Sequence, residues 1–221
     1  MKIATWNVNS IKSRVDHVVQ WCEINQPDVL CLQETKCVDA KFPLKRFTAI
    51  GYRHIEVVGE SAYNGVAIVS RLPLSDVVKK LPGDRTDAQT RFISATIDNI
   101  RVVNVYGPHG TSLGTPKYQF KLDWIGRLRK YFDKKFSTDE NVILCGDLNV
   151  APHESDVWSV AAWRNKLHFT KPERDAIQEL KKWGFVDVFR QINGDEREFS
   201  WWSNFRNDFE KDRGLRNRRH R

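Results

Sequence analysis

The feature that most constrains the fold of this 221-residue chain is a series of short apolar runs rich in β-branched residues. Each run is bounded by Gly, Pro, Asn or Asp, which is typical of β-strands separated by turns. Runs such as VLCLQ are apolar throughout, which favours strands that are covered on both faces. The runs that predict strands are Lys2–Trp6, Val29–Gln33, His54–Val58, Gly65–Ser70, Phe92–Ile97, Arg101–Val105 and Val142–Cys145.

Longer segments between these runs have the apolar spacing of helices. One follows Val15, Val18, Val19 and Cys22, and a second follows Phe120, Trp124, Leu128 and Phe132. The third is Lys171–Trp183, which has Pro172 near its start and is followed by Gly184. Strands mixed with helices predict an α/β fold. Because no repeat or low-complexity linker interrupts the chain, we expect one domain.

The composition of the chain indicates which class of partner and which cellular compartment to expect. The formal net charge of +8 favours a polyanionic partner such as nucleic acid, and part of it comes from the basic stretch 211–221. No stretch approaches 18 consecutive apolar residues and the N-terminus has no apolar leader, so we expect a cytoplasmic protein without membrane contact. The four cysteines show no C-x-x-C spacing, and we interpret Cys31 and Cys145, which lie inside apolar runs, as buried thiols. A monomer is the default expectation.

Polar side chains interrupt or directly follow several of the predicted strands. These residues are Asn7, Glu34, Asn104, Asp147 and Asn149. Any one of them could simply cap a turn, which Asp and Asn often do. Burying such groups costs free energy unless they are paired or bind a metal, and α/β folds gather ligand-binding groups at the carboxyl ends of strands. Their number therefore favours a functional site.

The chemistry of this set suits a hard cation. Glu34 and Asp147 supply carboxylate oxygens, and Asn7 and Asn149 supply amides. Mg²⁺ prefers one or two carboxylates together with water and substrate phosphates, with Mn²⁺ as the alternative, whereas a zinc site would call for a His or Cys cluster.

These residues lie within strings that resemble the exonuclease III family, in that family's order and approximate spacing. Six strings in register are strong evidence where one would be weak. The resemblance runs from Met1 to about Arg216. The strings are K-I-A-T-W-N-V-N-S-I at the start, L-C-L-Q-E-T-K at 30–36, Y-N-G-V-A-I-V-S-R at 63–71, N-V-Y-G-P-H-G at 104–110, L-C-G-D-L-N-V-A-P at 144–152 and F-S-W-W at 199–202.

The resemblance implies a four-layer α/β sandwich of two packed mixed sheets flanked by helices, and Mg-dependent hydrolysis of DNA phosphodiesters in base-excision repair. The substrate would be double-stranded DNA with abasic sites or 3′ ends. The metal ligands would be Glu34, Asn7, Asp147 and Asn149.

The resemblance also implies roles for single residues. Asp147 would position or deprotonate the attacking water, and Asn149 would hold the phosphate. Tyr106 matches an active-site tyrosine and Asn104 a supporting amide. On the DNA side the matching residues are Trp201, Arg91 and Asn64. For one member of the Trp201–Trp202 pair we expect core packing instead.

The chain departs from the family at its C-terminal end. Family members continue after G-L-R with I-D-x-I and later S-D-H, whereas here Asn217–Arg221 follows. We therefore assign 1–216 to an endonuclease/exonuclease/phosphatase domain that lacks the family's last strands, and 217–221 to a basic tail, and we expect impaired activity. A single-base insertion would produce this ending, because N-R-R-H-R shifted by one base can be read as I-D-x-I. The alternatives are a deliberately shortened chain and a member that ends here.

Two other functions stay open. One is another branch of the superfamily, such as an inositol-phosphate or sphingomyelin phosphodiesterase, which the strings N-V-Y-G-P-H-G and F-S-W-W disfavour. The other is a non-catalytic nucleic-acid binder, which the basic charge and the missing motifs allow. A nicking assay on an abasic duplex, with magnesium and with chelator, would separate the three.

Overall fold

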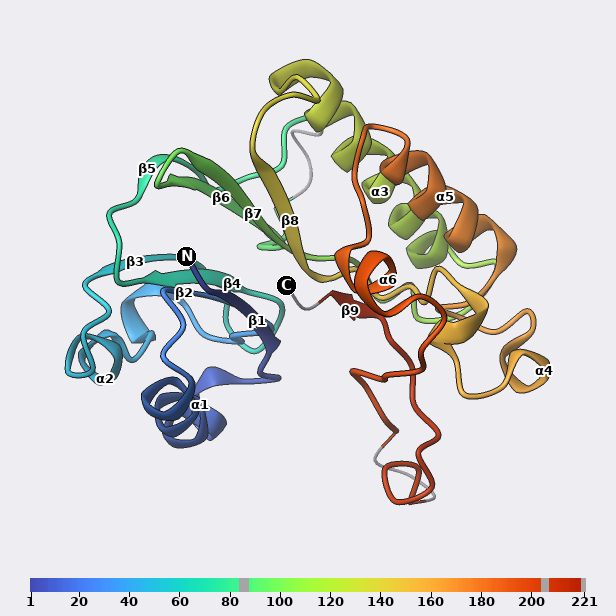
Figure 1. Cartoon of the computed structure of the whole chain (residues 1–221), viewed down its shortest axis with the longest axis horizontal. Coiled ribbons are helices and arrows are strands. Elements are labelled where there is room, and N and C mark those ends of the chain that lie inside the picture. Colours follow the sequence, from blue (N-terminus) through green and yellow to red (C-terminus); the bar gives the residue numbers. More distant parts are fainter. Residues whose placement is uncertain (84–87, 204–206, 220–221) are drawn as a thin grey trace. The chain divides into compact units, whose positions relative to one another are not determined.

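The computed structural model describes residues 1–83, 88–203 and 207–219 (Figure 1). These residues form two compact units that are interleaved in sequence. The first unit contains Met1–Tyr106 and Asp139–Asp147, and the second contains Gly107–Thr138 and Leu148–Arg219. The sequence predicts one domain because it contains no linker. The chain enters the second unit directly after Tyr106 and again directly after Asp147, each of which is the last residue of a strand. The composition of the sequence does not change at either point.

The first unit contains two mixed sheets. One has the spatial order β1 (Ile3–Asn7), β2 (Val29–Gln33), β4 (Val66–Ser70) and β3 (His54–Val58). The other contains β5 (Ser75–Val78), β6 (Phe92–Ile97), β7 (Ile100–Tyr106) and β8 (Val142–Asp147), in that order. Each sheet has one parallel pair, β1 with β2 and β7 with β8, and its other pairs are antiparallel.

The core of the first unit follows from the alternation of side chains along a strand. In β2, Leu30 and Leu32 pack with buried residues of α1 (Ile11–Asn25) and α2 (Leu44–Thr48), and a short 3₁₀ turn, η1 (Asp39–Lys41), precedes α2. Val29 and Cys31 point to the other face, where they pack against β4, β6, β7 and β8. The apolar run VLCLQ is therefore covered on both faces, as its composition predicts. Figure 1 shows α1 and α2 (blue) beside the sheet that contains β1.

The second unit is mainly helical. It contains α3 (Pro116–Lys135), η2 (Glu154–Asp156), α4 (Val160–Trp163), α5 (Lys171–Lys181), α6 (Val188–Asn193) and the two-residue strand β9 (Arg218–Arg219). Helices α3 and α5 pack side by side (Figure 1), and an aromatic cluster of Phe132, Trp183 and Phe185 lies near their C-terminal ends. None of the helices in the described parts of the chain is long and apolar enough to cross a membrane.

The predicted elements are largely confirmed. Val29–Gln33, His54–Val58 and Phe92–Ile97 match strands residue for residue, and the other four predicted strands differ by one or two residues at one or both ends. All three predicted helices are present, with α5 ending at Lys181 rather than Trp183. Cys31 and Cys145 are buried free thiols, as expected, and so are Cys22 and Cys37. Asn217, where the sequence predicts the start of a basic tail, is 4% exposed, and Arg218–Arg219 forms β9.

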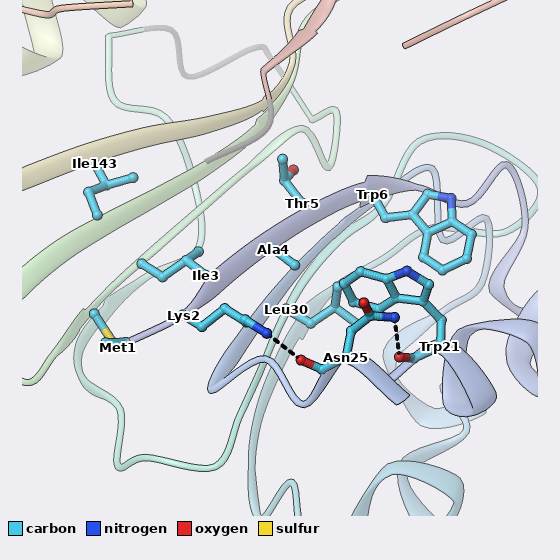
Figure 2. A pocket seen from close by; sticks show the side chains of 10 residues that line it. All are labelled: Met1, Lys2, Ile3, Ala4, Thr5, Trp6, Trp21, Asn25, Leu30 and Ile143. Atoms are coloured by element: carbon cyan, nitrogen blue, oxygen red, sulfur yellow. Dashed lines mark hydrogen bonds between the residues drawn. The ribbon is translucent and has the colours of Figure 1, made fainter. Parts of the chain in front are cut away.

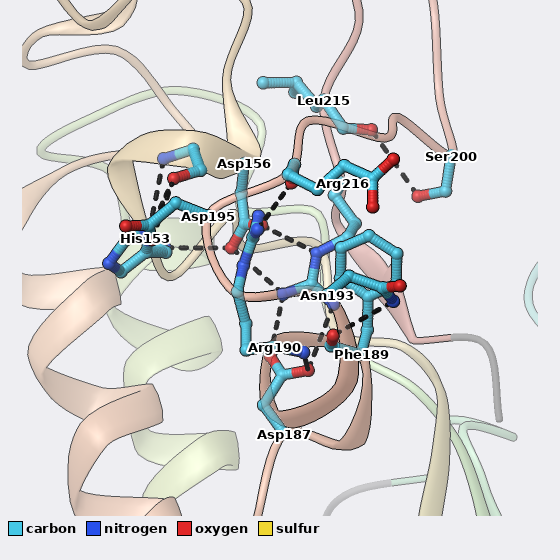
Figure 3. Close-up of polar contacts among 12 residues, drawn as sticks. His153, Asp156, Asp187, Phe189, Arg190, Asn193, Asp195, Ser200, Leu215 and Arg216 are labelled. Carbon is cyan, nitrogen blue, oxygen red and sulfur yellow. Dashed lines mark hydrogen bonds and ion pairs between the residues drawn. The ribbon is translucent and has the colours of Figure 1, made fainter.

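A buried ionic cluster holds the end of the second unit together (Figure 3). The guanidinium of Arg216 donates to Asp156 at 2.6 and 3.3 Å and to Asp187 at 2.7 and 3.3 Å. Arg190 also donates to Asp156, and Arg216 stacks over the ring of Phe189 at 4.9 Å. The side chain of Asp156 is 0% exposed and that of Arg216 is 6% exposed. Because the charges are buried, each depends on its partners.

We predict that Arg216→Met destabilises the protein by about 3–5 kcal/mol, because it leaves Asp156 and Asp187 buried without their main counter-charge. The shift of the urea-unfolding midpoint measures this effect. Arg46→Met is the matched control: Arg46 pairs with Asp16 at 2.6 Å on the surface, where such a pair contributes at most about 1 kcal/mol. Equal shifts for the two variants would contradict the prediction.

Candidate metal and phosphate site

The side-chain amide of Asn7 joins the two carboxylates that the sequence singles out. Its Nδ2 donates to Glu34 Oε1 at 2.7 Å and to Asp147 Oδ2 at 2.9 Å. Its Oδ1 accepts from the backbone N–H of Asn9 at 3.0 Å, so both Nδ2 hydrogens are directed toward the carboxylates. Asn7 and Asp147 are 4% and 2% exposed. Two acidic side chains separated by more than a hundred positions therefore meet at one buried nitrogen.

The fold produces this convergence from its two parallel strand pairs. Asn7 is the last residue of β1 and is paired with Gln33, the last residue of β2, which Glu34 directly follows. Asp147 ends β8 and is paired with Tyr106, the last residue of β7. The carboxyl ends of parallel strands meet at one edge of a sheet, which is where α/β folds place ligand-binding groups.

Glu34 is strained and ionised. It has φ of 52°, a left-handed conformation that non-glycine residues seldom adopt outside functional sites and turns. Burial alone would raise the pKa of its carboxyl, but hydrogen bonds from Asn7 and Lys36 outweigh burial and hold the pKa below its usual value. The Lys36 ammonium lies 3.0 Å from Glu34 Oε2. Lys36 is a site neighbour that the sequence analysis did not single out, although it stands in the quoted string L-C-L-Q-E-T-K.

Tyr106 lies beside both carboxylates. Burial raises the pKa of its phenol, and the negative charges of Glu34 and Asp147 raise it further, so the phenol stays protonated and can donate a hydrogen bond at neutral pH. Arg91 lies over the ring of Tyr106 at 4.9 Å and its Nη1 donates to the Tyr106 carbonyl at 3.3 Å. Arg91 therefore lies next to Tyr106.

Asn104 is 0% exposed and its amide is used inside the sheet core. Its Nδ2 donates to the carbonyls of Leu32 and Ala67 at 3.0 and 2.9 Å, and its Oδ1 accepts from Gln33 Nε2 at 2.7 Å. The sequence predicts a supporting amide here. These contacts link three strands, β2, β4 and β7, of which β2 ends directly before Glu34 and β7 ends at Tyr106.

Asn149 belongs to the second unit, two residues after Asp147 in sequence. It has φ of 55° and is 6% exposed. Its Nδ2 donates to the Gly107 carbonyl at 2.9 Å. A side chain at position 107 would meet the Leu148 carbonyl at 2.8 Å, so the close approach of these two loops requires glycine.

The remaining sequence-predicted residues lie on loops. Asn64, at φ 42°, donates to Glu60, and its carbonyl accepts from the Lys36 backbone N–H at 2.9 Å. Trp201 is half-buried and exchanges backbone hydrogen bonds with Leu215 at 3.0 and 2.9 Å. Trp201 packs against the buried cluster of Ala151, Val157, Phe169 and Leu215. Its neighbour Trp202 packs edge-on against the rings of Phe199 and Phe209, so the core packing expected for one member of the pair is found at Trp201, the residue assigned to DNA.

The donor set of the first unit fits a hard divalent cation. Among the residues that the structure describes, no group of three or more His, Cys, Asp or Glu side chains could hold a metal. Two carboxylates and an amide come together instead. The distance between Glu34 Oε1 and Asp147 Oδ2 cannot exceed the sum of their distances to Asn7 Nδ2. That sum lies below about 8 Å, the limit for sharing one ion directly or through water. Such a set suits Mg²⁺, which keeps several waters and takes further oxygens from phosphate.

An apolar pocket of about 790 Å³ lies elsewhere in the first unit, beside β1 (Figure 2). Its lining includes Ile3, Trp6, Trp21, Leu30 and Ile143. Its polar contacts serve the fold: Lys2 donates to the Asn25 carbonyl at 2.6 Å, and Asn25 to the Trp21 carbonyl at 3.0 Å. Since neither Glu34 nor Asp147 lines it, this pocket is separate from the polar site.

Comparison with known proteins identifies the family. The model of the endonuclease/exonuclease/phosphatase family matches residues 4–216. The chain belongs to this family. Family members in the comparison include exodeoxyribonuclease III of Haemophilus influenzae, which is 30% identical over 98% of this chain and 85% of its own length.

Solved structures agree with this assignment. An AP endonuclease from Archaeoglobus fulgidus has a TM-score of 0.95 and 39% identity, and the match covers all of this chain and 85% of that one. A Neisseria 3′ phosphatase, bound to a product DNA hairpin, has a TM-score of 0.92 and 36% identity at the same coverage. The expected α/β fold with two mixed sheets and helices is thereby confirmed.

We predict that Asn7→Ala raises the pKa of Glu34. In the wild type the pKa of this carboxyl lies below its unfolded value, so Glu34 stabilises the fold above the unfolded pKa, and this contribution is lost as the pH falls through the folded pKa. Removing the Asn7 donor leaves the carboxylates of Glu34 and Asp147 facing each other, which raises the pKa of Glu34. The contribution of Glu34 to stability is then lost at a higher pH. A ¹³C-carboxyl NMR titration of Glu34 measures the shift. Asn25→Ala, which removes an amide bonded to Trp21, is the control, and an unchanged titration in Asn7→Ala would refute the prediction.

Proposed function

We propose that this chain is a Mg²⁺-dependent nuclease that hydrolyses DNA phosphodiesters at abasic sites and at 3′ ends. The observation that carries the proposal is the bridge from Asn7 to both Glu34 and Asp147, which brings two carboxylates together at the strand ends. The relatives described as exodeoxyribonuclease III, AP endonuclease and a DNA-bound 3′ phosphatase support DNA as the substrate. The formal charge of +8 is in keeping with a polyanionic partner.

Each assigned residue would have its own role in hydrolysis. Glu34 and Asp147 would hold Mg²⁺, which when bound stabilises the negative charge that develops on the phosphate and on the leaving oxygen. Asn7, whose Nδ2 hydrogens face both carboxylates and whose Oδ1 accepts from Asn9, would orient them, and Asn149 is the further amide of the expected ligand set. Asp147 would orient the attacking water and accept its proton. Tyr106 and Asn149 would donate hydrogen bonds to the phosphate, a role that suits a phenol that stays protonated.

DNA contacts would come from side chains around these groups. Arg91, which lies over Tyr106, would add positive charge next to the phosphate, and Asn64 would contact the backbone of the same strand. Trp201 would stack on a base near the abasic site, an interaction that contributes roughly 1–3 kcal/mol. Phosphate contacts of this kind hold the duplex without reading its sequence, which suits an enzyme that recognises a lesion rather than a sequence.

We predict that the chain nicks a duplex with one abasic site in Mg²⁺ and that chelator abolishes the nicking. Glu34→Gln should lower the single-turnover rate roughly 10²-fold or more, because it removes charge from the proposed cation site. Glu56→Gln is the matched control. It removes a carboxylate of the same unit that pairs with Lys79 at 2.8 Å near the surface, and it should leave the rate unchanged. Incision that persists in chelator, or equal rates for the two variants, would exclude the proposed function.

A further inference from the structure

A fully buried ion pair in the second unit contacts the backbone of Asn149. Lys121 of α3 and Glu173 of α5 are both 0% exposed, and their charged groups are hydrogen-bonded to each other. The Lys121 Nζ also donates to the Asn149 carbonyl at 2.7 Å and to the His109 carbonyl at 3.3 Å. Burying an ammonium is expensive, so a lysine in this position indicates that its donors have specific acceptors.

The Glu173 carboxylate is saturated with donors. Its Oε1 accepts from the His168 backbone N–H at 3.1 Å, and its Oε2 accepts from the Thr170 backbone N–H at 3.0 Å and from the Thr170 hydroxyl at 2.8 Å. Glu173 is the third residue of α5 and closes a capping box with Thr170. The helix start therefore fixes the carboxylate, and the carboxylate fixes the Lys121 ammonium.

A second donor reaches the same carbonyl of Asn149. His168 Nδ1 lies 2.7 Å from the Asn149 oxygen, and because a carbonyl only accepts, Nδ1 carries the hydrogen. The ring also packs edge-on against His109 at 4.6 Å. Asn149 is thus held at three points: its carbonyl by Lys121 and by His168, and its side-chain amide by the Gly107 carbonyl.

We propose that Lys121, fixed by Glu173, is a positioning residue that orients Asn149 for the phosphate. This inference rests on the proposed function, since it assumes that the Asn149 amide donates to a phosphate oxygen. The two carbonyl donors hold the peptide of Asn149, whose φ is 55°, in one orientation and so fix where its side chain begins. An amide displaced by about 1 Å would lose much of its hydrogen bond in the transition state.

The test compares charge-neutral variants. Lys121→Met/Glu173→Gln removes both charges and so leaves no uncompensated buried ion, while the glutamine oxygen still accepts from the α5 start. Lys171→Met/Asp175→Asn is the matched control, an exposed pair on the same helix at 2.6 Å. We expect the buried double variant to lower kcat for abasic DNA about 10–100-fold with little change in KM, and the control to change neither.

A measurement that does not depend on activity shows whether the fall in kcat results from a change at Asn149. The two ¹⁵N–¹H cross-peaks of its side-chain amide, assigned by their loss in Asn149→Asp, should shift in the buried double variant, stay in place in the control, and return in Lys121→Arg. Cross-peaks that do not move, with kcat unchanged in a folded variant, would overturn the proposal.

If the double variant does not fold, a second variant tests the same inference. His168→Phe keeps a ring against His109 and leaves the ion pair intact, but it removes the other donor to the Asn149 carbonyl. We expect shifted amide cross-peaks and a kcat lowered by about 3–10-fold. Unmoved cross-peaks in this variant would equally overturn the inference. A wild type that binds but never incises abasic DNA would refute the proposed function instead, and the cross-peaks would still decide whether Lys121 positions Asn149.

Discussion

The candidate site depends on one interaction, the contact of the Asn7 amide with two carboxylates. Glu34 and Asp147 carry like charges, and bringing them together in a partly buried place raises the free energy unless a donor or a cation lies between them. The amide supplies two hydrogens for this purpose, at 2.7 and 2.9 Å, and Asn9 fixes its orientation from the other side. A neutral donor lowers the repulsion without cancelling the charge. The pair therefore keeps its attraction for a divalent cation.

The rest of the first unit serves to hold those three residues in place. The parallel pairs β1–β2 and β7–β8 end at Asn7, Gln33, Tyr106 and Asp147. Inside the core, Asn104 bonds to the carbonyls of Leu32 and Ala67 and to Gln33, so it ties one sheet to the other just before the strands end. Losing this buried amide would remove three hydrogen bonds from the core, each of which contributes about 0.5–1.5 kcal/mol. Asn104 thus supports the site through the strands.

The sequence predicted the parts of the structure that depend on local pattern. Runs such as VLCLQ and FISATI match strands because β-branched residues and turn signals act over a few positions. Convergence of Glu34 and Asp147 could also be predicted, since both follow apolar strands whose carboxyl ends gather. The strand β5 (Ser75–Val78) was missed because half of it is exposed and its register with β6 shifts, so it lacks a clear apolar alternation.

Buried charge was the part that sequence pattern could not reveal. Lys121, Glu173, Asp156 and Arg216 are charged residues in segments that also contain exposed charges, and single-sequence reasoning assigns such residues to the surface. Their burial depends on partners that are 52 and 60 positions away. The T-x-x-E pattern at Thr170–Glu173 was a usable signal for the start of α5, but it does not predict that a lysine of α3 pairs with Glu173.

The central claim is that Glu34 and Asp147 serve one cation, and a double-mutant cycle on Mn²⁺ affinity tests it most directly. Mn²⁺ binding to the wild type, Glu34→Gln, Asp147→Asn and the double variant would be followed by electron paramagnetic resonance. The account predicts that each single change weakens one common site by about tenfold or more, and that the double variant is weaker than the wild type by clearly less than the product of the two effects. Strictly multiplicative losses, or full affinity in either single variant, would contradict it.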